Sequence, residues 1–168
     1  VWNLSLGSRL ESPKNTISPE AAMLDKLQNE YDIVFVVAGT NKTQKDSRIK
    51  PKRIGALADS INSLVVNATS ILKEPASYTR EGPVLNFFRK PDISCFGGDD
   101  TEQMAVWSPQ GVALTAGTSF AAPWITRKMA YLIYVMHFSR ETAKAMLIDA
   151  ASGWKKISAD NIKVGYGI

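Results

Sequence analysis

The sequence predicts an α/β fold in three layers, with a mostly parallel sheet covered by helices on both faces. One observation is the order of patterns in residues 1–38, where a strand, a helix and a second strand follow one another as a βαβ unit. Another is the second strand itself, because residues 33–38 form a continuous, largely β-branched apolar run typical of a strand buried on both faces. A long apolar helix pattern over residues 119–138 supplies a further covering element.

The first strand and the first helix have clear local signals. Residues 1–7 alternate apolar and polar side chains, which predicts a strand, and Gly7 and Ser8 close it. A helix should begin at Ser18-Pro19-Glu20 and run to about Glu30. A serine caps the helix, a proline fits its first position, and a carboxylate in the first turn is favoured by the helix dipole.

The middle of the chain reads as loops around one short strand. Residues 42–52 are polar and charged and predict an exposed loop, whereas residues 62–68 predict a short strand of buried type. Residues 75–83 are rich in turn-forming residues. An acidic loop follows, and either a solvated turn or a cation site is compatible with it. Its carboxylates belong to Asp99, Asp100 and Glu102.

Two helices are expected after residue 118. The first, residues 119–138, is apolar on nearly every side and is expected to lie in the core. The second should be capped by Ser139, carry Glu141 in its first turn and end at Gly153. Its predicted apolar face consists of Ala143, Met146, Leu147 and Ala150.

Composition excludes several classes of protein. The chain has 168 residues, 45% of them hydrophobic and 21% charged, which is ordinary for one globular domain. A single cysteine rules out an intramolecular disulfide, and one cysteine with one histidine cannot build a zinc site of the usual kind. The longest apolar run, residues 129–136, is too short to cross a bilayer, so we expect no membrane partner. The compartment is not indicated.

The net charge of +4 raises the alternative of a nucleic-acid-binding domain. The basic residues are scattered apart from one cluster, and a charge run of this kind is more often a solvated loop. We therefore expect no nucleic-acid partner. The cluster consists of Lys42, Lys45, Arg48, Lys50, Lys52 and Arg53.

The strongest functional signal is the run Gly-Thr-Ser-Phe-Ala-Ala-Pro at residues 117–123. Pro123 places the helix start, because proline is tolerated only within the first turn. Ser119 is then at the helix N-terminus, where unpaired N–H groups and the dipole favour developing negative charge. Ser119 is a candidate nucleophile, and the alternative is an ordinary helix N-cap.

A second signal is Asn41, three residues after the end of the buried strand at Ala38. In open α/β sheets, ligands bind beyond the carboxyl ends of the strands. A side-chain amide follows the strand at this place, with small residues before it that leave room for a ligand. The alternative is that Asn41 only turns the chain.

Together these segments resemble the subtilisin-like serine peptidases, over most of residues 1–153. The matches are the serine motif at residues 117–123, Asn41 after a buried strand, the run Ser5-Leu6-Gly7, and the run Lys90-Pro91-Asp92-Ile93. Two positions depart from the family pattern. The Ala-Pro-Gly that often follows the last run is replaced by residues 94–98, and Trp124 stands where many relatives have histidine.

The resemblance implies a role for each matched segment. Ser119 would be the nucleophile of a serine endopeptidase, with Asn41 and the Ser119 N–H as oxyanion donors. Ser5, Leu6 and Gly7 would pair with the bound peptide as an added strand. The opposite wall of the specificity pocket would be formed by Ala38, Gly39 and Thr40. No cofactor is implied, although members of the family can carry structural calcium.

The chain lacks a base for Ser119. His137 lies eighteen positions further along the same predicted helix, roughly 27 Å away at 1.5 Å per residue, and Lys128 is roughly 13 Å away. In the family the catalytic Asp and His precede the Asn and Ser. Residues 1–168 are therefore expected to be the carboxyl portion of one peptidase domain, with the Asp and His half upstream of Val1. Its expected partners are that half and a peptide or protein substrate, and the rival is a non-catalytic peptide-binding module.

Overall fold

The computed structural model describes residues 1–43, 53–151 and 161–168. Four parallel strands form the central sheet in the spatial order β1-β2-β3-β4: β1 (Trp2–Leu4), β2 (Phe35–Ala38), β3 (Leu64–Thr69) and β4 (Ile93–Phe96). In neighbouring strands, Asn3 lies opposite Val36, Val37 opposite Val65, and Val66 opposite Ile93. Adjacent parallel strands end at the same edge of the sheet, so the segments after β1 and β2 become neighbours.

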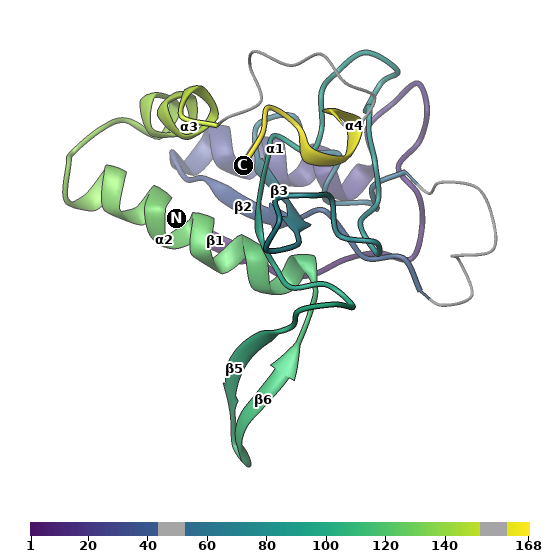
Figure 1. Ribbon diagram of the computed structural model, residues 1–168. Helices are drawn as coiled ribbons and strands as arrows, with labels where there is room; N and C mark the ends of the chain where they lie inside the picture. The colour runs from purple at the N-terminus through teal and green to yellow at the C-terminus, as the bar shows by residue number, and fades with distance from the viewer. Residues whose placement is uncertain (44–52, 152–160) are drawn as a thin grey trace.

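Helices cover both faces of the sheet, as the sequence predicts (Figure 1). Alternate side chains of β2 and β3 enter two separate cores. On one face Val36 and Val66 pack with the helices α2 (Thr118–Tyr134) and α3 (Arg140–Asp149). On the other face Val37 and Val65 pack with α1 (Pro19–Tyr31) and the loop that contains Ile54. The three-layer α/β class is therefore confirmed.

Local capping explains where α1 begins and ends. The Ser18 hydroxyl accepts a hydrogen bond from the Ala21 N–H at 3.2 Å, and Pro19 occupies the first helical position. The Ser18 backbone N–H also donates to buried Asp59, which ties this helix start to the second core. The helix ends at Tyr31, and the capping residue Asp32 has a left-handed backbone (φ 50°) that reverses the chain into β2.

The helix α2 differs from its prediction in length and in burial. It ends at Tyr134 rather than near residue 138, and only one side of it is buried. Among the described residues, the opposite side is left in solvent, with Trp124 48%, Tyr131 55% and Tyr134 63% exposed. The expectation of a helix buried all round is wrong. β1 is the outermost strand of the sheet, and in the described chain no element lies beyond β1 to cover the outer side of α2.

The helix α3 begins as expected, with the Ser139 hydroxyl accepting from the Thr142 N–H at 3.2 Å. Ala143 is fully buried, but Met146 of the predicted apolar face is 42% exposed. The helix ends at Asp149, so the predicted stop at Gly153 is wrong by four residues. Gly153 itself lies outside the described residues, as does most of the loop predicted over residues 42–52. A further short helix, α4, spans Asn161–Val164.

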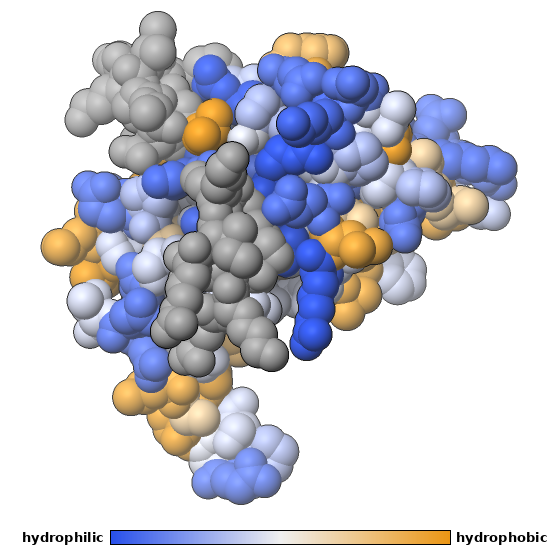
Figure 2. Space-filling view, turned by 90° about the vertical axis from the view of Figure 1, so that its right-hand side faces the viewer, coloured by the Kyte–Doolittle hydropathy of each residue, from blue (hydrophilic) through white to orange (hydrophobic). Residues whose placement is uncertain are grey.

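One element has no counterpart in the sequence-based prediction. An antiparallel hairpin, β5 (Met104–Ser108) and β6 (Gly111–Thr115), projects away from the rest of the molecule immediately before α2 (Figure 1). Its exposed face carries Trp107, Val112 and Leu114, each more than 60% exposed. Figure 2 shows this hydrophobic surface on the protruding hairpin. No described helix is long and apolar enough to span a membrane.

Candidate functional site

Ser119 is the second residue of α2, in the helix's first turn. The residue that caps the helix is Gly117, which makes no side-chain capping bond. The N-cap interpretation of Ser119 is therefore wrong. Its Oγ instead donates to the Ser5 carbonyl at 3.3 Å, while the Ser5 hydroxyl donates to the Ser119 carbonyl at 2.9 Å. These two contacts join the start of α2 to the segment that follows β1.

Asn41 reaches the same helix start from the end of β2. Its Oδ1 accepts from the Thr118 backbone N–H at 3.1 Å and from the Thr118 hydroxyl at 2.9 Å. This contact spans 77 positions of sequence, so Asn41 does more than turn the chain. Because Oδ1 accepts these two bonds, the Asn41 amide is held in one orientation, with its Nδ2 directed away from Thr118. Among the described residues, that Nδ2 donates to no group.

Ser119 and Asn41 line one cavity of about 220 Å³ beyond the carboxyl ends of β1 and β2. Four of the six predicted substrate-binding residues line it as well: Leu6, Gly7, Ala38 and Thr40. Ser5 and Gly39 lie beside it rather than in its wall. Ser5 is bonded to Ser119, and Gly39 packs against β3 so closely that a Cβ there would lie 1.9 Å from the Asn67 Oδ1.

Other residues of the cavity wall carry no signal in the sequence. Ser8, Arg9, Thr43 and Arg80 belong to loops, and only the fold brings them beside Ser119. The segment containing Arg80 pairs with the segment containing Asn41: the Lys42 N–H donates to the Tyr78 carbonyl at 2.7 Å and the Arg80 N–H to the Thr40 carbonyl at 3.4 Å. Thr118 also lines the cavity, and the serine motif itself could have identified it.

A half-buried tyrosine holds the turn after β4 to which the start of α2 is bonded. The Tyr78 hydroxyl donates to the Gly98 carbonyl at 2.7 Å, and the Gly117 N–H donates to the Gly97 carbonyl at 2.9 Å. Burial, and after it the negative charge of Asp99, raise the pKa of Tyr78 well above its usual value. Its hydroxyl therefore stays protonated and keeps donating to this turn at all physiological pH values.

The structure separates Ser119 from the chain's one histidine. His137 lies three residues beyond the end of α2, and Ser119 lies at the other end of that helix. At a rise of 1.5 Å per residue, the part of the helix from Ser119 to Tyr134 alone separates them by roughly 22 Å. His137 therefore cannot accept the proton of Ser119.

The acidic loop is a hydrogen-bonded turn in the structure. Asp99 and Asp100 both lie within hydrogen-bond distance of the Ser77 hydroxyl, at 2.9 and 3.0 Å, and the Asp99 N–H donates to the Glu102 carbonyl. In the parts of the chain that the structure describes, no group of three His, Cys, Asp or Glu residues is arranged to hold a metal ion. Four residues of the basic cluster, Lys45, Arg48, Lys50 and Lys52, fall outside the described residues.

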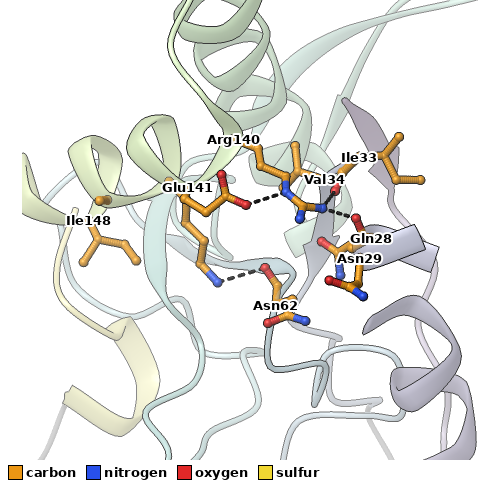
Figure 3. Close-up of a pocket in the computed structure, with 10 residues that line it drawn as sticks. Gln28, Asn29, Ile33, Val34, Asn62, Arg140, Glu141 and Ile148 are labelled. Atoms are coloured by element: carbon orange, nitrogen blue, oxygen red, sulfur yellow. Dashed lines mark hydrogen bonds and ion pairs between the residues drawn. The ribbon is translucent and has the colours of Figure 1, made fainter. Parts of the chain in front are cut away.

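A larger cavity, of about 380 Å³, lies at the opposite end of the sheet, between α1 and α3 (Figure 3). The positively charged side chains of its wall are hydrogen-bonded to backbone carbonyls. Arg140 donates to the Ile33 carbonyl at 3.0 Å, and Lys144 to the Asn62 carbonyl at 2.9 Å. No serine, threonine, cysteine or histidine is among the described residues of its wall. The cavity beside Ser119 is therefore the candidate active site.

A family model described as the subtilase family, peptidase S8, matches residues 1–167. The chain belongs to the subtilase family. Solved subtilase-like structures agree with this fold. The prenylagaramide maturation protease PagA superposes with a TM-score of 0.76 at 19% identity. The match covers 98% of this chain and 57% of the PagA chain. The patellamide maturation protease PatA gives 0.72 at 18% identity with the same coverages.

A third solved structure is the epidermin leader peptide processing serine protease EpiP from Staphylococcus aureus, with a TM-score of 0.72 at 18% identity. The match covers 98% of this subtilase chain and 47% of the EpiP chain. The chain thus spans about half the length of the solved structures it matches. A search of curated protein sequences finds no significant match.

Proposed function

We propose that this subtilase chain forms the nucleophile-bearing part of a serine endopeptidase, with Ser119 as the acylated residue. The observation that carries the proposal is the convergence of Ser119 and Asn41 on one cavity, with the Asn41 Oδ1 held by Thr118. A hydroxyl in the first turn of a helix, beside an oriented amide donor, is the arrangement that acyl transfer requires.

The chemistry follows from these two groups. The Ser119 Oγ attacks the carbonyl carbon of the peptide bond and gives up its proton to a base, forming a tetrahedral oxyanion. That oxyanion accepts hydrogen bonds from the Asn41 Nδ2 and the Ser119 backbone N–H. Collapse of the intermediate breaks the C–N bond, and the amine leaves with a proton from the protonated base. Water then hydrolyses the acyl ester and regenerates Ser119.

The base is proposed to be a His-Asp pair supplied from outside residues 1–168, in the upstream half of the same domain. The uncovered side of α2, with Trp124, Tyr131 and Tyr134, supports this because a large apolar surface is normally covered by another packed element. The position of β1 as the outermost strand also supports it, since its free edge offers backbone groups for a further strand.

The proposed substrate is a peptide or protein chain. Residues 5–7 continue from β1 along the cavity, so a bound peptide could pair with them as an added strand. Gly7 lets this segment pack closely against Thr40 in the opposite wall. A Cβ at Gly7 would lie 2.8 Å from the Thr40 Cγ2. The names of the similar solved structures, which are maturation and leader-peptide-processing proteases, support a polypeptide precursor as the substrate.

The test uses a fluorophosphonate, which reacts with activated serines, on the protein that carries this chain together with its upstream part. We expect labelling of the wild type and none of Ser119→Ala. Ser108→Ala is the matched control, because Ser108 ends β5 next to the hairpin turn and, among the described residues, its hydroxyl bonds only with Gln110 and Gly111. Equal labelling of the wild type and Ser119→Ala would refute the nucleophile. No labelling of either would favour the rival, a non-catalytic peptide-binding module.

A further inference from the structure

The specificity pocket is the part of the cavity that lies between residues 5–7 and residues 38–40. In the proposed reaction Ser119 attacks the carbonyl carbon of the residue that precedes the scissile bond, and the backbone of that residue pairs with residues 5–7. Its side chain then enters the cavity beside Thr40. The whole cavity holds about 220 Å³, which is below the roughly 300–1,000 Å³ typical of ligand sites, and the peptide backbone takes up part of it.

Thr40 narrows this pocket because its side chain reaches the opposite wall. A Cβ on Gly7 would lie 2.8 Å from the Thr40 Cγ2 and 3.3 Å from its Oγ1, so the threonine side chain packs directly against the Gly7 backbone. On its other side, a Cβ on Gly55 would lie 2.9 Å from the Thr40 Oγ1. The Thr40 side chain therefore fills the space between Gly7 and Gly55, into which a longer substrate side chain would otherwise extend.

The floor next to this threonine is closed by two paired loops. The Ala56 N–H donates to the Leu10 carbonyl at 3.3 Å, and Glu11 and Gly55 form an antiparallel bridge. The loops touch so closely that a Cβ on Gly55 would lie 2.6 Å from the Ser8 carbonyl oxygen. Because close-packed backbone fixes both loops, the floor does not retreat to admit a large side chain.

The conformation of Thr40 is unusual for a threonine. Its backbone has φ 78°, a left-handed value that is an outlier for a β-branched residue and that glycine adopts without strain. Its Oγ1 is buried and has no hydrogen-bond partner among the described residues. Both features cost stability, and strained or unsatisfied residues of this kind concentrate at functional sites. A role in the pocket therefore explains this threonine better than a role in folding.

We propose that Thr40 restricts the pocket beside Ser119 to substrates with a small residue, glycine, alanine or serine, before the scissile bond. This specificity rests on the proposed peptidase function. A small side chain fits beside Thr40 without moving it, whereas a leucine or phenylalanine side chain overlaps the Thr40 Cγ2. Because Thr40 is held between Gly7 and Gly55, the overlap is relieved only by displacing the peptide from Ser119, which lowers kcat/KM.

The experiment uses fluorogenic peptides that differ only in the residue before the cleaved bond: glycine, alanine, serine, leucine or phenylalanine. The protein that carries this chain with its upstream part is assayed for kcat/KM on each peptide. We expect the alanine peptide to exceed the leucine and phenylalanine peptides by about 10-fold or more, which is the order expected for overpacking a closed pocket. A leucine or phenylalanine peptide that matches or exceeds the alanine peptide would overturn the proposal.

Three variants test whether Thr40 sets the restriction, through the ratio of kcat/KM for the phenylalanine peptide to that for the alanine peptide. Thr40→Gly removes the side chain at a φ that suits glycine, and the ratio should rise by about 10-fold or more. Thr40→Ser removes only the Cγ2 that packs against Gly7, and the rise should be smaller. Thr40→Val keeps the shape of the side chain and is the matched control, with a ratio close to that of the wild type. An unchanged ratio in Thr40→Gly, or an equal rise in Thr40→Val, would contradict the assignment.

Failure of the specificity is distinguishable from failure of the peptidase function. Fluorophosphonate labelling of Ser119 reports the nucleophile without any demand on the pocket. Calorimetric binding of the phenylalanine peptide to Ser119→Ala, with and without Thr40→Gly, reports the pocket without any demand on catalysis. Tighter binding in the presence of Thr40→Gly supports the restriction even if no labelling occurs. Equal binding to the two proteins overturns the restriction even if Ser119 is labelled.

Discussion

The two ends of the central sheet each carry a cavity, and the polar groups around them are arranged differently. At the amino end, Lys90 is fully buried and donates to Asp92 at 2.6 Å and to the Ser63 carbonyl at 2.8 Å. Lys144 also reaches the Ser63 carbonyl, at 3.1 Å. At the carboxyl end, the Asn41 Nδ2 and the Thr40 hydroxyl have no partner in the described chain.

This difference shows how the fold separates stability from chemistry. Charges at the amino end are satisfied by protein oxygens, so they fasten the loops that precede β3 and β4 to each other. Donors at the carboxyl end are oriented but unsatisfied, so they remain available to a ligand. We therefore expect substitutions at the carboxyl end to change activity and substitutions at the amino end to change stability.

The largest expected effect is the loss of the Ser119 hydroxyl. Ser119→Ala in the protein with its upstream part should lower kcat/KM for peptide hydrolysis by about 10³-fold or more, because only oxyanion binding then remains. Its free energy of unfolding should change by less than about 1 kcal/mol, since the lost contact to the Ser5 carbonyl is a long one of 3.3 Å. Kinetics and urea unfolding of the same preparation check both parts. A large loss of stability would contradict the separation.

The next effect is at Asn41. Asn41→Asp keeps the Oδ1 acceptor for Thr118 but removes the Nδ2 donor, so kcat should fall by about 10²–10³-fold with little change in KM, a range known for the corresponding donor of a subtilisin-type enzyme. Thr118→Val is the matched variant, because it removes one of the two bonds that orient the amide and leaves the donor present. Its kcat should lie between the wild type and Asn41→Asp. Equal kcat values for Asn41→Asp and the wild type would exclude Asn41 as an oxyanion donor.

A third test concerns the amino end of the sheet. Lys90→Met leaves buried Asp92 without its close ion-pair partner, and we expect a loss of about 3–5 kcal/mol in unfolding free energy. Lys144, 3.8 Å from Asp92, is the remaining cation. The double variant with Asp92→Asn should recover part of the loss, because asparagine still accepts from the Val65 N–H. Fluorophosphonate labelling of the folded fraction should be unchanged, and loss of labelling would break the comparison.

The smallest expected effect is a dependence of stability on pH. Burial lowers the pKa of Lys90 to about 8, although Asp92 opposes the shift. The unfolded chain holds this proton up to about pH 10.5, so between pH 8 and 10.5 the unfolded state binds more protons than the folded one. Lys90 therefore makes unfolding free energy rise with pH in this window, by at most about 1.4 kcal/mol per unit. The wild type should gain stability relative to Lys90→Met from pH 8 to 10. A constant difference would refute the shift.

The sequence predicts those parts of the fold whose causes are local. The cap at Ser18 and Pro19 places the start of α1, and the apolar run before Gly39 places β2. The prediction that Pro123 lies in the first turn of α2 is wrong, because Pro123 is the sixth residue of that helix. Ser119 still lies in the first turn, as predicted, because the helix begins one residue before it at Thr118. The pairing of Ser119 with the Ser5 carbonyl follows only from the parallel order of β1 and β2.

What the sequence could not predict depends on contacts between distant segments. Arg80 lies 39 positions from Asn41, and nothing near it in sequence indicates that its guanidinium binds that residue's carbonyl. The pattern of α2 shows that its side chains are apolar, but not which neighbours would cover them. The hairpin was missed because its two strands lack a strict alternation of apolar and polar side chains, although Pro109 and Gly111 mark its turn.

The central claim is that Ser119 is acylated at the carboxyl end of the sheet. Peptide mapping by mass spectrometry, after fluorophosphonate treatment of the protein with its upstream part, tests it most directly. The account predicts a single phosphonylated residue, Ser119, and no adduct in Ser119→Ala. An adduct on another serine, or hydrolysis of peptides by a protein whose Ser119 stays unmodified, would contradict it.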